Sequence, residues 1–129
     1  MKAPPPTERQ VQRSILRMAG LCFPDVLIVH VPNGAHLSGD HRARCMQIGS
    51  LKGDGLKVGF PDLLAIWNRD VAFIEVKRPG GKLSPEQKYM HQMLGSLGFP
   101  PAVVTSPEEA YAFLRERGAP CKSEWRQAA

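Results

Sequence analysis

The chain has 129 residues, of which 43% are hydrophobic, and these values fit one domain with one core and leave little room for a second. No apolar run approaches the roughly 20 residues that a membrane-spanning helix needs, so we expect no membrane association. The net charge of +5 and the pI of about 9.4 favour a polyanionic partner such as nucleic acid, although many basic proteins bind none.

The first predicted helix follows the proline run at residues 4–6. Thr7 and Gln10 fit a capping box, and Glu8 lies in the first turn, where the helix dipole favours an anion. Gly20 is the expected end. The apolar stripe that indicates a core-facing side consists of Val11, Ile15, Met18 and Ala19.

A strand and a long basic segment follow. Residues 26–31 form a β-branched run that predicts a strand, which Pro32-Asn33-Gly34 ends. Residues 34–60 are rich in glycine and basic side chains, and a long loop of this kind inside a domain is more often functional than idle. Within it, residues 44–51 fit either a strand or a short helix.

The second half alternates strands and helices. Residues 62–67 and 71–77 read as a hairpin, and 102–105 as a short strand. Two helices begin at Ser84 and Ser106, each followed by Pro at the first helical position. The core-facing stripe of the earlier of these helices is Met90, Met93, Leu94 and Leu97. The order α-β-β-β-α-β-α predicts an α/β (α+β) fold, with a small mixed sheet flanked by helices.

The hairpin brings polar residues together. Asp62 lies thirteen residues before Glu75. If Asn68 pairs with Val71 around a two-residue turn, Asp62 lies opposite Lys77, and all three polar side chains share one face. An odd-numbered turn would separate them unless a bulge intervened, so we predict an even turn or a bulge. The opposite face would carry Leu63, Ala65 and Trp67, with Phe73 nearby.

Two carboxylates and a lysine on one face are poor material for a core. A divalent cation relieves the repulsion between the carboxylates, and hard ions such as Mg²⁺ also bind phosphate oxygens. Such an ion polarises a scissile phosphate and acidifies a bound water. Lys77 would either orient the attacking water or stabilise the developing negative charge. From spacing alone, a surface hairpin with a Glu–Lys pair remains the more frequent explanation.

The pattern resembles the PD-(D/E)XK nucleases, with their restriction-endonuclease-like core. It resembles most closely the VRR-NUC branch, found in stand-alone phage and bacterial proteins and in the Fanconi-associated nuclease. The shared segments are Pro32–Gly34, Gly55–Leu64, Phe73–Lys77, Gly81–Gln87 and Ser106–Ala110. The resemblance covers about residues 7–116, which leaves a tail at 117–129 within a single domain over 1–129.

The resemblance implies a nuclease that depends on Mg²⁺ or Mn²⁺. Asp62 and Glu75 would bind the metal ion together with the Val76 carbonyl, and Lys77 would be the catalytic lysine. Gln87 would face the active site from the next helix.

Glu8 matches the family's helix-borne acidic residue that completes the metal site, although a Glu in a capping turn also suits the helix dipole on its own. Several basic residues are candidate phosphate contacts, and each also fits a solvated surface charge. They are Arg42, Arg44, Lys52, Lys57, Arg78 and Lys82.

The expected activity is endonucleolytic hydrolysis of duplex or branched DNA. Small stand-alone nucleases commonly act as homodimers, and two active sites related by a two-fold axis suit cleavage of a four-way (Holliday) junction. A non-catalytic nucleic-acid-binding module of the same fold and an RNA nuclease are the alternatives.

Other polar residues have simpler explanations. His36, His41 and Cys45 could suggest zinc, but a structural zinc site normally needs four well-placed ligands, so these histidines are expected to face solvent or phosphate. His91 reads as a helix-surface histidine rather than one that points toward the active site. The odd number of cysteines without a C-x-x-C pair indicates reduced thiols, and no apolar leader precedes Thr7. We expect a cytoplasmic protein of a bacterial or phage-infected cell.

Overall fold

The structure is a computed structural model that describes residues 2–32 and 39–126. Most of the Pro32-Asn33-Gly34 signal and His36 lie outside the described residues. The elements in chain order are α1 (Glu8–Cys22), β1 (Leu27–His30), α2 (His41–Gly53), β2 (Leu63–Trp67), β3 (Asp70–Val76), α3 (Pro85–Ser96), β4 (Ala102–Val104) and α4 (Pro107–Glu116). The predicted α/β class is confirmed, and α2 shows that residues 44–51 are helical.

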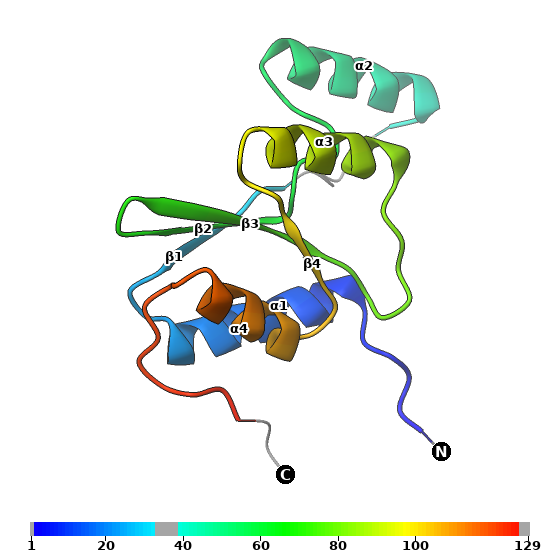
Figure 1. Ribbon diagram of the computed structural model, residues 1–129. Coiled ribbons are helices and arrows are strands. Elements are labelled where there is room, and N and C mark those ends of the chain that lie inside the picture. Colours follow the sequence, from blue (N-terminus) through cyan, green and yellow to red (C-terminus); the bar gives the residue numbers. More distant parts are fainter. Residues whose placement is uncertain (1, 33–38, 127–129) are drawn as a thin grey trace.

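The strands form a mixed sheet in the order β1-β2-β3-β4, with only the β3–β4 pair parallel. Figure 1 shows α1 and α4 packed side by side on one face of this sheet, α3 on the other face, and α2 beyond α3. Within the described ranges, no helix combines the length and apolar character of a membrane span.

The core lies between the sheet and the α1–α4 layer. Ile15 and Met18 of α1 are fully buried against it, as is Leu114 of α4. Alternate residues of the central strands supply the sheet side, as the pleat requires. These residues are Leu63, Ala65, Trp67, Ala72, Ile74 and Val76.

The predicted capping box of α1 is present. The Gln10 backbone N–H donates to Thr7 Oγ1 at 3.2 Å, and the Thr7 N–H donates to Gln10 Oε1 at 2.9 Å. The expected end at Gly20 is wrong, because the helix runs on to Cys22. Cys22 and Phe23 are each 1% exposed, so the last turn of α1 is held by burial in the core.

The hairpin register corrects one expectation and confirms another. Trp67 pairs with Asp70, and the turn is Asn68-Arg69, both with positive φ as in a type I′ turn. The turn is therefore even, as predicted. The pairing differs from the predicted one by two residues, however. Leu63 pairs with Ile74, and continuing this register sets Asp62 opposite Glu75 rather than opposite Lys77.

Phe73 was expected near the face that carries Leu63, Ala65 and Trp67, and this is wrong. It pairs with Leu64 and lies on the α3 side, where its ring packs edge-on against Phe60 and Phe99 at centroid distances of 5.5 and 6.2 Å. This aromatic cluster fills space beneath α3, and it separates the polar end of that face from the hairpin tip.

Only half of the stripe predicted for α3 is buried. Met90 and Leu94 are buried, whereas Met93 is 40% and Leu97 66% exposed. Met93 lines an outward-facing hollow with Tyr89, Gln92 and Ser96 instead. The apolar face of α3 that meets the sheet is narrow because two polar residues of the helix, Gln87 and His91, occupy part of that side and contact Glu75.

Candidate active site

Asp62 sits at the entrance of β2 and is held from both sides. Its Oδ2 accepts a hydrogen bond from the Val76 backbone N–H at 2.8 Å. Its backbone carbonyl accepts one from the Val31 N–H at 2.7 Å, which ties it to the end of β1. Contacts to two neighbouring strands therefore fix the position of the Asp62 carboxylate.

Glu75, one residue before the end of β3, is the only buried charged residue among those the structure describes. Burial, followed by the hydrogen bond and the negative charge of Asp62, raises the pKa of Glu75 to about 9, against the opposing charge of Lys77. Burial beside Asp62 therefore favours the protonated form of the Glu75 carboxyl.

The first two turns of α3 supply the other contacts of Glu75. Gln87 Nε2 donates to Glu75 Oε2 at 3.5 Å, while Gln87 Oε1 accepts from the Ser84 N–H at 2.9 Å in the capping box. His91 Nε2 lies 3.1 Å from Glu75 Oε1. The expectation that His91 is a surface residue is wrong: its side chain is 12% exposed, and burial lowers its pKa.

Lys77 follows β3 and is half-buried. Its backbone N–H donates to the Val104 carbonyl at 2.9 Å, so the parallel β4 strand holds it in line with Glu75. The charge of Lys77 acts on the pKa values of Glu75, Glu8 and His91, so its ammonium group lies within electrostatic reach of these three side chains.

Glu8 is the first residue of α1 and is exposed. Partial desolvation raises its pKa, Lys77 and Arg78 lower it, and Asp62 raises it. Glu8 therefore borders the site, together with Arg78 of the loop after β3. Its role as a metal ligand stays a prediction, as does that of the Val76 carbonyl.

Gly59 joins the loop before Asp62 to the first turn of α3. It is buried with φ +84°, and a Cβ atom at this position would lie 2.5 Å from the Glu86 carbonyl oxygen and 2.9 Å from the Gln87 backbone nitrogen. The absence of a side chain allows the two backbones to meet, and this contact sets α3 over Glu75.

The carboxylates suit a hard divalent cation. Across residues 2–32 and 39–126, no three His, Cys, Asp or Glu side chains are gathered closely enough to hold an ion as they stand. The Glu75 carboxyl is nevertheless buried beside Asp62, whose negative charge helps to raise the pKa of Glu75, and a cation between the two would offset that repulsion. Ions such as Mg²⁺ commonly bind one or two carboxylates together with water and phosphate oxygens. The donor set therefore fits such an ion, with the remaining ligands supplied by carbonyl, water or substrate.

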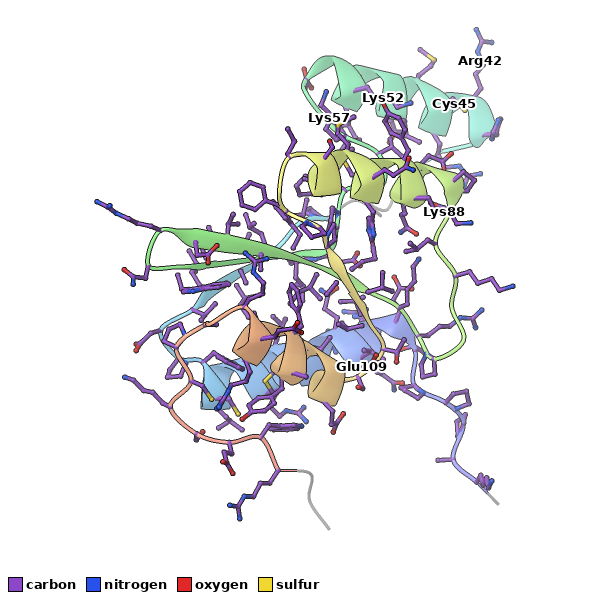
Figure 2. The ribbon with its side chains drawn as sticks, in the orientation of Figure 1. Arg42, Cys45, Lys52, Lys57, Lys88 and Glu109 are labelled. Carbon is purple, nitrogen blue, oxygen red and sulfur yellow. The ribbon has the colours of Figure 1, made fainter. Side chains whose placement is uncertain are left out.

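The predicted phosphate contacts fall into two groups. Arg78 and Lys82 are exposed in the loop between β3 and α3, beside the carboxylates. The others lie on α2 or just after it: Arg42, Arg44, Lys52 and Lys57, all exposed. Figure 2 shows Arg42 and Lys52 on the outer helical layer, with α3 between them and the sheet. The structure does not bring this second group to the carboxylates.

The zinc candidates do not assemble among the described residues. His41 Nε2 and Cys45 Sγ are 3.5 Å apart, one turn apart on the exposed surface of α2, and His36 lies outside the described residues. Cys22, Cys45 and Cys121 are free thiols.

Sequence reasoning misjudged His91 and missed His30. The spacing of four residues from Gln87 places His91 on the same face of α3, but a surface position was the expected one. His30, at the end of β1, has its Nδ1 3.1 Å from the Asp62 carbonyl oxygen and 3.2 Å from Gln12 Nε2. Because a carbonyl only accepts and an amide nitrogen only donates, the tautomer of His30 decides which of these two contacts is a hydrogen bond.

Comparison with known proteins adds one finding. The VRR-NUC domain family model matches residues 8–108, a span that includes all the residues gathered around Asp62 and Glu75. No curated protein matches the chain.

The raised pKa of Glu75 predicts how stability depends on pH. The unfolded carboxyl ionises near 4.5, whereas the folded one resists ionisation up to about 9, so Glu75 lowers stability progressively as pH rises between these values. Glu75→Gln should therefore raise the Tm in EDTA at pH 8, with the gain shrinking toward pH 4.5. Scanning calorimetry across this range checks it, with exposed Glu116→Gln as control, and a pH-independent loss of Tm in Glu75→Gln would contradict it.

The tight contact at Gly59 predicts a specific cost for a methyl group. Gly59→Ala should destabilise the fold, because it adds both a positive-φ penalty and a clash with the backbone of α3. Gly80 has nearly the same φ, +80°, but open space around it. Urea unfolding should show a larger loss of stability for Gly59→Ala than for Gly80→Ala, and equal losses would show that the α3 contact is unimportant.

Proposed function

This chain belongs to the VRR-NUC domain family of the PD-(D/E)XK nuclease superfamily, and from that premise we propose that it is a metal-dependent DNA endonuclease. Family membership makes it a nuclease with a nucleic-acid partner. The metal dependence, the DNA substrate and the roles of individual residues are our proposals. The observation that carries them is the Glu75 carboxyl, which is buried beside Asp62 and within the electrostatic influence of Lys77.

Asp62 and Glu75 would hold an Mg²⁺ or Mn²⁺ ion. When bound, the ion supplies a polarised scissile phosphate and an acidified water. The protein contributes the fixed geometry: the Val76 N–H orients Asp62, and α3 orients Glu75. Because the ion must replace the proton on Glu75, its affinity should rise with pH toward about 9.

Lys77 is the proposed catalytic cation. It follows β3, two residues after Glu75, and its charge already acts on Glu75 and on Glu8. In the reaction it would either orient the attacking water or stabilise the negative charge that develops on the phosphate. Gln87 would act on the reaction centre indirectly, through its contact with Glu75.

The basic residues are placed to contact the phosphates of a nucleic acid that extends away from the site. Arg78 borders Glu8, and Lys82 lies in the same loop, so both suit phosphates next to the scissile bond. Arg42, Arg44 and Lys52 project from α2, which has no buried residue, and would contact a more distant part of a duplex or branched substrate.

We further propose a homodimer that cleaves both strands of a branched DNA. The α3-side face of the sheet leaves apolar residues uncovered near β1: Leu27 is 61%, Val29 39% and Ile66 39% exposed. A second copy would bury such a patch, and two-fold symmetry would then present two active sites to a four-way junction.

Substitution of Lys77 tests the catalytic assignment. Lys77→Met should lower the cleavage rate with Mn²⁺ by about 10²–10³-fold, the typical cost of losing one electrostatic stabiliser. Binding of the same DNA in Ca²⁺ should change little. Lys122→Met removes a lysine that pairs with Asp25 at the far end of α1 and serves as the control. Full activity of Lys77→Met would remove Lys77 from the mechanism.

A substrate panel tests the finer proposal. Purified protein with Mn²⁺ should nick four-way junctions symmetrically, and faster than single-stranded, flap or linear duplex DNA of the same sequence. Indifference to DNA structure would sink the junction proposal, and preference for RNA would identify an RNA nuclease. If no DNA or RNA is cleaved although it is bound, the chain is a binding module.

A further inference from the structure

Both oxygens of the Glu75 carboxylate meet α3. His91 Nε2 is 3.1 Å from Oε1, and Gln87 Nε2 is 3.5 Å from Oε2. Four residues separate Gln87 from His91, so they project from the same face of the helix. The contact with His91 is nearly dry, because the two side chains are 12% and 1% exposed.

The two contacts differ in kind. The Gln87 amide is already engaged, because its Oε1 closes the capping box with Ser84, and its Nε2 reaches Glu75 only at the limit of a hydrogen bond. His91 makes the shorter bond, and it has no other hydrogen bond among the described residues. Of the two contacts from α3, the one from His91 therefore constrains the orientation of the buried carboxylate more strongly.

We propose that His91 is a positioning residue: its Nε2–H holds Oε1 of Glu75 so that the remaining carboxylate lone pairs face Asp62 and a divalent cation bound there. This inference rests on the metal-dependent nuclease proposed above. An ionised carboxylate offers about four acceptor sites, so the bond from His91 leaves others free for the cation. Carboxylates that bind metals are commonly held by such outer hydrogen bonds, and loss of one typically costs about 10–100-fold in metal affinity or activity.

The position of His91 is itself determined by packing. Two residues of α3 are buried: Met90, immediately before His91, and Leu94, three residues after it. At the start of the helix, Gly59 fixes the first turn against the loop that leads to Asp62. His91 is therefore delivered to Glu75 by a helix with two independent anchors, which is what a positioning residue requires.

Binding of Mn²⁺ alone, measured by isothermal titration calorimetry at 25 °C, tests the proposal without any cleavage. His91→Leu removes the donor and should weaken Mn²⁺ binding by about 10–100-fold. His91→Gln keeps an N–H donor at similar reach and should bind Mn²⁺ close to the wild type. Gln92→Leu makes a similar change on the next residue, which faces the outer hollow, and should leave affinity unchanged.

The folded state of each variant is checked by circular dichroism in EDTA, and His91→Ala replaces the leucine variant if that one does not fold. Wild-type affinity in the variant without a donor overturns the positioning role and leaves the nuclease proposal standing. Equal weakening in His91→Gln and His91→Leu also overturns it, since the donor would then be irrelevant. If the wild type binds no Mn²⁺, or Glu75→Gln binds it equally well, the cation site itself falls, and this inference falls with it.

Discussion

The burial of the Glu75 carboxyl next to Asp62 is the constraint on which the rest of the site depends. Burying the Glu75 carboxyl beside a second acidic group is unfavourable, and three features offset the cost: a raised pKa of Glu75, two contacts from α3 and the positive charge of Lys77. The arrangement lowers stability at neutral pH, and the proposed cation would relieve this cost. Glu75 thus lowers the stability of the fold at the position where the proposed function needs a carboxylate.

The two faces of the sheet differ in role: one supplies the hydrophobic core and the other carries the candidate site. The α1–α4 face is filled by alternating apolar residues from the central strands, such as Leu63 and Ile74, and it supplies the core. The intervening positions carry Asp62 and Glu75 to the α3 face. Because side chains alternate along a strand, one hairpin serves as a wall of the core and as a platform for the site.

The α3 helix converts this platform into a site. It is held by a capping box, by the close approach at Gly59 and by the buried Met90 and Leu94, and its polar residues then reach Glu75. α2, by contrast, buries none of its residues and adds an outer basic layer. The inner helix therefore holds the carboxylate of the proposed cation site, and the basic outer helix suits contact with a polyanion.

The sequence by itself determined the features that depend on neighbours along the chain: the capping boxes at Thr7 and Ser84, the even turn, and the grouping of Asp62 with Glu75 on one face. It left open whether residues 44–51 are helical. It also misjudged the register of the hairpin by two residues. The side-chain pattern indicates whether the turn has an even number of residues, but the position of the turn depends on which residues accept positive φ. Only the tertiary structure decided that α1 extends to Cys22, that Phe73 packs beneath α3 and that His91 meets Glu75. Those outcomes arise from packing between segments far apart in sequence, which no local pattern encodes.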